Sequence, residues 1–118
     1  MPVLARTLES AGLSTVLVTN MPFWAEKAGV PRTLAVEFPF GQMLGRPGEI
    51  EQQRRVVEQA LAVLEKAEAP GTIVHSPEMW PLPAEQAMKD WQPDEPSPVM
   101  DVLRPHVMKL MRQRRRRG

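Results

Sequence analysis

The fold is decided by residues 11–48, which read AGLSTVLVTNMPFWAEKAGVPRTLAVEFPFGQMLGRPG. Two apolar runs rich in β-branched residues stand out in this stretch, at residues 15–19 (TVLVT) and 33–38 (TLAVEF). Each run ends in a turn-forming sequence, and residues 22–28 between them read as a short helix. Because both runs are almost continuously apolar, they predict buried strands of a parallel sheet rather than half-exposed antiparallel strands.

The segments on either side extend this pattern to a β-α-β-α-β order. Residues 3–11 favour a helix before the first strand, residues 49–67 predict the longest helix, and residues 72–75 (TIVH) predict a third strand. The expected fold class is therefore α/β, a small three-layer parallel sheet. The apolar positions expected to face the sheet are Leu4, Leu8 and Ala11 on the first helix, and Ile50, Val57, Ala60, Leu61 and Leu64 on the long one.

Proline divides the chain into two parts. The sequence has 13 prolines in 118 residues, about twice the ~5% of average usage, and eight of them lie in residues 70–105. We therefore expect an α/β domain at residues 1–76 and a Pro-rich helical arm at residues 77–118. Because a core of this size supplies only a few kcal/mol, a partner surface or a homo-oligomer is expected.

The arm itself contains two helical patterns. Residues 84–91 predict a short helix, and residues 99–114 carry an apolar helical stripe that Pro105 must bend or begin. The stretch at residues 92–98 is expected to form a polyproline spacer. Residues 114–118, which are four arginines and a glycine, are expected to be disordered.

Composition excludes several classes of protein. The chain has no cysteine, so disulfides, thiolate metal sites and a cysteine nucleophile are excluded, and nothing points to secretion. The N-terminus does not resemble a signal peptide, and no apolar run approaches the ~18 residues that span a bilayer. We therefore expect a cytoplasmic protein without a membrane partner.

Charge is distributed unevenly along the chain. The formal net charge is +1, but five of the 15 Lys and Arg residues lie in residues 112–118. Without these five, ten bases face 14 acids, which leaves a mildly acidic body. We interpret the arginine tail as a solvated segment, so nucleic acid is not the expected partner.

Polar groups are expected at the carboxyl ends of the three strands, where ligands of open parallel sheets bind. The loop at residues 41–48 (GQMLGRPG) could offer backbone N–H groups there, although its simpler reading is a tight connection that needs positive φ. Asn20 also suits the N-cap of the helix at residues 22–28. The predicted substrate-binding residues are Thr19, Asn20, Gly41, Gln42, Gly45 and His75.

No catalytic group is predicted within this set. His75 has no cysteine in the chain and no acidic cluster beside it, so neither a catalytic triad nor a metal site can be assembled. We therefore predict no metal and no cofactor. Trp80 and Trp91 are interpreted as packing residues of the arm.

Residues 3–74 resemble one protein family in the order of their motifs. The motifs are ESAGL at residues 9–13, GVPR at residues 29–32 and PFGQMLGRP at residues 39–47. They are similar to the C-terminal part of the selenoprotein B component of glycine, sarcosine and betaine reductases and of the related D-proline reductase subunit. The resemblance implies an oxidoreductase that cleaves a C–N bond next to a carboxyl group with a selenolate or thiolate nucleophile.

This chain lacks the cysteine or selenocysteine that the family uses. The resemblance therefore implies a subunit that is not catalytic alone, with a Cys- or Sec-bearing companion chain and a small amino-acid-like substrate bound in the complex. The alternative is a non-enzymatic assembly module, a homodimer joined through residues 99–111 with its arginine tail on nucleic acid.

Overall fold

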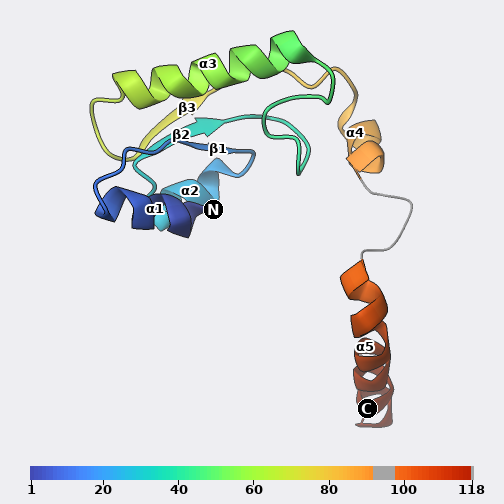
Figure 1. Cartoon of the computed structure of the whole chain (residues 1–118). Coiled ribbons are helices and arrows are strands. Elements are labelled where there is room, and N and C mark those ends of the chain that lie inside the picture. The colour runs from blue at the N-terminus through green and yellow to red at the C-terminus, as the bar shows by residue number, and fades with distance from the viewer. Residues whose placement is uncertain (92–97, 118) are drawn as a thin grey trace.

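The computed structural model of this chain describes residues 1–91 and 98–117. It consists of a small α/β body followed by two helices, and Figure 1 shows the arrangement. The elements in chain order are α1 (Pro2–Ser10), β1 (Leu17–Thr19), α2 (Pro22–Ala28), β2 (Arg32–Ala35), α3 (Ile50–Lys66), β3 (Thr72–His75), α4 (Ala84–Trp91) and α5 (Pro98–Arg117).

The sheet has three parallel strands in the order β1-β2-β3. Helix α3 covers one face, and α1 and α2 lie on the other, so the body has three layers (Figure 1). This confirms the predicted α/β fold with a small parallel sheet. The strands β1 and β2 are shorter than predicted, and β1 is only half-buried along its length, because it lies at an edge of the sheet.

Two apolar cores lie on opposite faces of the sheet. Leu34 is fully buried and faces α3, where it packs with Val56 and Val63. On the opposite face a smaller cluster joins Ala5 of α1 to Ala25 of α2. Leu34 of the central strand thus belongs to the core under α3, whereas the smaller cluster is completed by Val30, just before that strand.

The buried faces of two helices differ from the predicted ones. The residues of α3 that face the sheet are Gln52, Val56, Ala60 and Val63, whereas Ile50 and Leu61 are exposed. In α1 the buried residue is Ala5, whereas Leu4 is half-exposed. Ala5 is buried against Ala25 of α2 and Val30, so α1 packs mainly on α2.

A buried glutamine explains the rotated face of α3. The side-chain oxygen of Gln52 accepts a hydrogen bond from the backbone N–H of Arg46 at 3.1 Å, and its amide nitrogen donates to the carbonyl oxygen of Met79 at 3.2 Å. These bonds satisfy a polar group under the helix. They also tie the loop before α3 to the segment after β3.

The glycine loop has the predicted backbone conformation. Gly41, Gly45 and Gly48 have φ values of +79°, +120° and +82°, which side-chain-bearing residues rarely adopt. The predicted role of Asn20 as an N-cap is wrong. The N-cap of α2 is Met21 without a side-chain cap, and the N–H of Met21 donates instead to the hydroxyl of Thr19 at 3.0 Å.

The C-terminal part forms helices where the sequence predicts them. Helix α4 has the predicted bounds, whereas α5 runs through Pro105 and extends to Arg117, so the predicted disorder of residues 114–117 is wrong. The predicted spacer lies mainly in residues 92–97, outside the described residues. Helix α5 lies away from the α/β body (Figure 1). No helix among the described residues has both the length and the apolar character to cross a membrane.

Candidate functional site

The carboxyl ends of the three strands meet at one edge of the sheet. Thr19 of β1 lies beside Ala35 of β2, and Ala35 lies beside His75 of β3. The ladder continues one residue further, because the N–H of Val36 donates to the carbonyl oxygen of Thr19 at 2.9 Å and the N–H of Ser76 donates to that of Ala35 at 2.8 Å. The strand ends therefore form one continuous edge.

A cavity of about 570 Å³ opens at the β1 end of this edge. Three of the six predicted binding residues line it, namely Thr19, Asn20 and Gly41. Its remaining wall comes from α1, β1, α2 and the glycine loop, and the lining contains no charged side chain. We call this space the β1 cavity; its apolar wall includes Met1, Val3, Leu17, Trp24 and Met43.

A second cavity of about 410 Å³ lies on the other side of Asn20. Phe38 and Trp80 form its aromatic wall, with ring centroids 5.5 Å apart, and the lining also includes Glu37 and Leu82. The indole nitrogen of Trp80 is buried without a hydrogen-bond partner among the described residues. We call this space the aromatic cavity.

Two residues, Phe40 and Asn20, line both cavities, and Asn20 is the one with a polar side chain. Its amide nitrogen donates to the carbonyl oxygen of Phe38 at 3.0 Å. That bond links the turn after β1 to the segment after β2 and fixes the orientation of the amide. A primary amide has a second N–H and a carbonyl oxygen, so Asn20 can hold a polar ligand in either cavity.

Gln42 and Gly45 are not among the residues that line either cavity, although the neighbours of Gln42, Gly41 and Met43, line the β1 cavity. Gly45 is buried beneath the start of α3, where a Cβ atom would stand 3.0 Å from the side-chain oxygen of Gln52. The side-chain oxygen of Gln42 is buried without a partner among the described residues. The structure therefore places these two residues in the support of the glycine loop rather than in a cavity wall.

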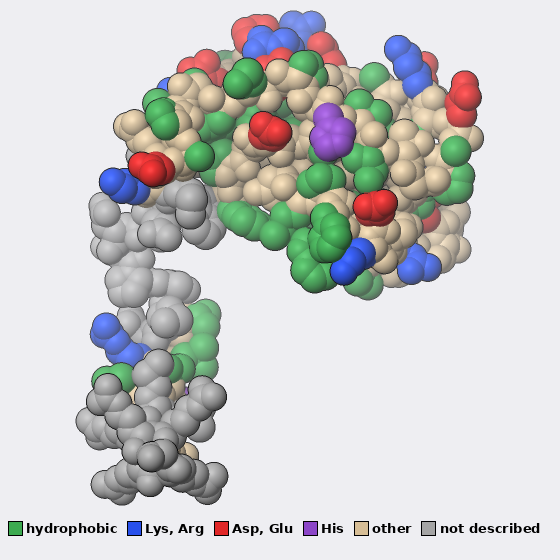
Figure 2. All heavy atoms as spheres, turned by 180° about the vertical axis from the view of Figure 1, so that it is seen from behind, with side chains coloured by type: hydrophobic (Ala, Val, Ile, Leu, Met, Phe, Trp, Pro, Cys, Tyr) green, Lys and Arg blue, Asp and Glu red, His purple; other side chains and the backbone are tan. Residues whose placement is uncertain are grey.

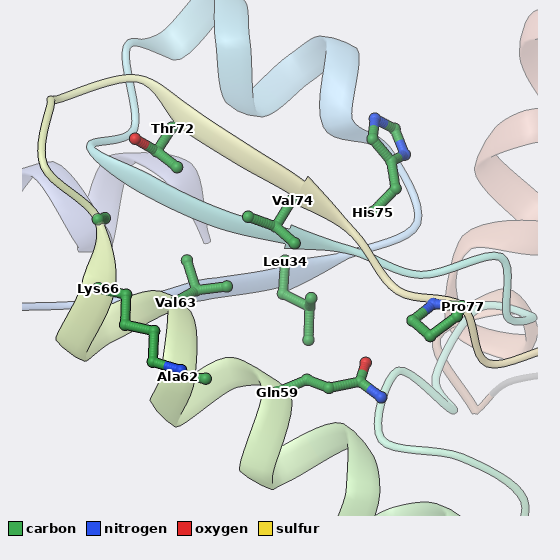
Figure 3. Close-up of a pocket in the computed structure, with 10 residues that line it drawn as sticks. Leu34, Gln59, Ala62, Val63, Lys66, Thr72, Val74, His75 and Pro77 are labelled. Carbon is green, nitrogen blue, oxygen red and sulfur yellow. The ribbon is translucent and has the colours of Figure 1, made fainter.

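His75 lies at a third cavity, of about 270 Å³, between β3 and α3. Figure 3 shows Leu34, Val63 and Val74 directed toward one another, whereas the imidazole of His75 points to the opposite face of the sheet. No group of His, Cys, Asp and Glu that could hold a metal is found among the described residues. His75 is separated from Asn20 by the central strand.

Two ion pairs stabilise the body outside these cavities. The carboxylate of Glu9 accepts hydrogen bonds from the backbone N–H and the hydroxyl of Thr15 and pairs with Arg32 at 2.9 Å. These donors, the Thr15 N–H foremost, lower the pKa of Glu9. Hydrogen bonds from Arg55 at 2.7 and 3.0 Å likewise lower the pKa of Glu78.

The surface seen from behind carries charged groups above and beside an apolar area (Figure 2). Figure 2 shows acidic and basic groups interspersed along the upper side formed by α3, whereas hydrophobic side chains gather along the lower side of the body.

Sequence reasoning did not assign the aromatic cavity, because it treated Trp80 as packing of the arm. The sequence does contain a signal for this cavity: residues 77–83 directly follow β3, so they leave the sheet at the edge where the carboxyl ends of the strands meet.

The arrangement can bind a small molecule but offers little for catalysis. The β1 cavity has apolar walls, an amide and a glycine backbone, and no titratable side chain lines it. A reaction within the β1 cavity that needs a side-chain nucleophile or base would take that group from outside its lining.

Comparison with known proteins gives one distant relative. Over 87 residues, which is 74% of this chain, the sequence is 29% identical to the D-proline reductase subunit gamma of Acetoanaerobium sticklandii. The match covers 34% of that subunit, so the chain spans about a third of the length of its curated relative. No protein-family model and no solved structure matches the chain. The similarity supports a distant relationship to the D-proline reductase family.

Proposed function

We propose that this chain is a non-nucleophilic subunit of a reductase-like complex of the glycine, sarcosine, betaine or D-proline reductase type. The observation that carries the proposal is the similarity to D-proline reductase subunit gamma over 74% of the chain. The chain contains no cysteine, so the thiol or selenol would come from a companion chain.

In this complex the chain would contribute a substrate-binding surface at the carboxyl-end edge of its sheet. A small amino-acid-like substrate would lie at the β1 cavity, with its carboxylate at the free N–H of Asn20 and the backbone around Gly41. The hydroxyl of Thr19 would be fixed by the N–H of Met21, which donates to it at 3.0 Å. The companion chain would cover this edge and bring its nucleophile to the C–N bond next to the carboxyl group.

Reconstitution tests this role. The chain is co-expressed with the product of a neighbouring reading frame that encodes a Cys- or Sec-bearing chain, and product release is measured with a dithiol reductant. The product is the free amine for glycine, sarcosine and betaine, and the ring-opened 5-aminopentanoate for D-proline, whose nitrogen stays on the carbon chain. We expect release only when both chains are present. Activity of the companion alone, or no release with any substrate from a stable complex, would contradict the proposal.

A matched pair of variants then tests whether Asn20 belongs to this substrate-binding surface. In the reconstituted complex, Asn20→Ala should lower the product-release rate about 100-fold, because a positioned amide that binds a charged group contributes several kcal/mol. Arg54→Ala on the exposed side of α3 should leave the rate unchanged, since its contact is with Glu58 in the same helix. Equal rates for both variants would remove Asn20 from the site.

A second candidate is a non-enzymatic assembly module that forms a homodimer. The apolar side chains exposed on α5 favour it. If the arginine tail also contacts nucleic acid, deletion of residues 112–118 should abolish a salt-dependent binding of RNA or DNA. Salt-independent or undetectable binding by the full chain would exclude that contact.

A further inference from the structure

Helix α3 has an apolar flank that its own chain leaves uncovered among the described residues. The other flank faces β3, because Arg55 donates to Glu78 and Gln59 accepts a hydrogen bond from the Ser76 hydroxyl, just after that strand. The helical period of 3.6 residues places a second set of side chains on the flank away from β3, on the β1 side of the sheet. This set, which we call the α3 stripe, consists of Ile50, Val57, Leu61 and Leu64.

Most of the α3 stripe lies at the surface. Ile50, Leu61 and Val57 are 72%, 56% and 41% exposed, and Leu64 is half-buried. None of the four lines any of the three cavities described above. Among the described helices, no other lies beside α3 in its layer (Figure 1). Neighbouring large apolar side chains at the surface of a helix mark a contact with another protein surface.

The α3 stripe is its own complement. Ile50, Val57 and Leu64 follow a seven-residue spacing, which is the spacing that lets two helices pack side by side. Val57 is the midpoint of the three. In an antiparallel pair of α3 helices that cross at Val57, each Ile50 therefore lies opposite Leu64 of the second copy. A pairing of this kind uses the same surface of both copies and closes on a twofold axis.

The polar groups beside the α3 stripe fit this antiparallel pair. Arg54 and Glu58, which pair at 2.9 Å within one helix, border the stripe on its solvent side. In the antiparallel register each Arg54 lies within one turn of Glu58 in the second copy, whereas parallel helices would place Arg54 beside Arg54. Leu61 comes opposite Gln53, whose amide already donates to the carbonyl oxygen of Arg46 at 2.8 Å. No unpaired charge therefore has to be buried.

We propose that two copies of this chain associate through their α3 stripes, as an antiparallel helix pair with Val57 at the twofold axis. A contact made by one helix pair lies at the low end of stable interfaces, so we expect a Kd in the micromolar range. This inference is independent of the proposed reductase role, since it requires neither a companion chain nor a substrate. It also differs from a dimer joined through α5.

A single cysteine tests whether Val57 meets Val57 of the second copy. The chain has no cysteine, so Val57→Cys carries the only thiol. Val74→Cys is the matched control, because Val74 is 42% exposed but lies in β3, on the other side of α3. Under mild oxidation Val57→Cys should form a disulfide-linked dimer at least tenfold faster than the control, because a disulfide needs two Cβ atoms about 4 Å apart. Equal rates would overturn the proposal.

Solution mass tests the same contact without a cross-link. Light scattering at about 200 µM should give twice the chain mass for the full chain and for Leu103→Glu, whose change lies on α5. Val57→Glu and Val57→Lys should each raise the dimer Kd at least tenfold, because like charges then face each other across the axis. An equimolar mixture of these two variants should recover the dimer, since opposite charges then meet. Far-UV circular dichroism checks that each variant is folded.

Four results would overturn the proposal. The first two are a full chain that is monomeric at about 200 µM and a mixture of folded charge variants that stays monomeric. A monomeric Leu103→Glu variant would assign the dimer contact to α5. If Val57→Cys links only to the companion chain in a reconstituted complex, the α3 stripe binds that chain and not a second copy. The reductase role is measured separately by product release, so the two proposals can fail independently.

Discussion

Helices α3 and α5 are both long and amphipathic, yet they differ in what covers their apolar sides. In α3, Val56 and Val63 are buried against the sheet. In α5, Val99 and Leu103 lie at the surface. Periodicity predicts each helix equally well, because it reports the existence of an apolar side. It does not report whether the covering surface belongs to the same chain.

The difference divides the molecule into a part that holds itself together and a part that depends on contact. The body has two apolar cores, and hydrogen bonds from Gln52 and Asn20 connect its loops. No comparable contact is seen for α5 in the described part of the chain. Stability should therefore respond to changes in the body more than to changes in α5.

The largest expected effect separates the two parts most clearly. Leu34→Ala removes a fully buried side chain from the central strand and should lower the free energy of unfolding by about 3 kcal/mol. Leu103→Ala should change it by less than about 0.5 kcal/mol, because Leu103 is 44% exposed. Urea titration followed by circular dichroism measures both. Equal losses would mean that α5 belongs to the folded core.

A pair of glycines tests the junction between the loop and α3. Gly45→Ala should cost about 2 kcal/mol, because φ is +120° and the new Cβ would stand 3.0 Å from the oxygen of Gln52. Gly48→Ala should cost about 1 kcal/mol, since φ is +82° but no atom lies within 4 Å of its Cβ. The difference in urea midpoint isolates the close approach to Gln52. A larger loss at Gly48 would contradict this geometry.

Removal of a buried hydroxyl in β2 should increase the stability of the protein. Thr33 is fully buried, and its hydroxyl has no hydrogen-bond partner among the described residues. Thr33→Val should therefore raise the free energy of unfolding by about 1 kcal/mol. Thr72→Val is the control and should lower it by a similar amount, because the Thr72 hydroxyl donates to the carbonyl oxygen of Ala69 at 2.6 Å. Thr33→Val should raise the free energy of unfolding by the same amount in a chain that lacks α5.

The smallest effect is a dependence of stability on pH that arises within the body. The pKa of Glu9 is lower in the folded state than in the unfolded chain, so its contribution is present above the unfolded pKa and is lost as pH falls through the folded one. The urea midpoint should therefore decrease on acidification below about pH 4.5. Glu9→Gln should flatten that decrease, whereas Glu58→Gln, on the exposed side of α3, should retain it.

The order of the elements could be predicted from the sequence, because their signals are local. The bounds of α2, β3 and α4 follow from Pro22, from the Pro70-Gly71 stop and from the spacing of residues 84–91. The positive φ of the loop follows from its glycines. Local preference and the final structure agree at these positions, so no knowledge of the packing is needed.

The buried faces and cavity walls could not be predicted, because they depend on contacts that are distant in sequence. The spacing of apolar residues in α3 predicts that Ile50 and Leu61 are buried. The inward position of Gln52 is explained by its hydrogen bonds to Arg46 and Met79, which are visible only in the structure. Asn20 resembles an N-cap locally, but its amide bonds Phe38 instead. The grouping of Thr19, Asn20 and Gly41 at one cavity follows from strand order, whereas the aromatic cavity requires the path of the chain after β3.

The sequential order β1-β2-β3 also bears on how the protein is made. Each strand pairs only with its neighbour in the sequence, across the connections at residues 20–31 and 36–71. The sheet can thus be built outward in the direction of translation, one strand at a time, as the chain leaves the ribosome. Strand β3 pairs last and satisfies the free backbone N–H and C=O groups along one side of β2. A nascent chain stalled before residue 72 would leave these groups unpaired, and an exposed strand edge of this kind favours aggregation.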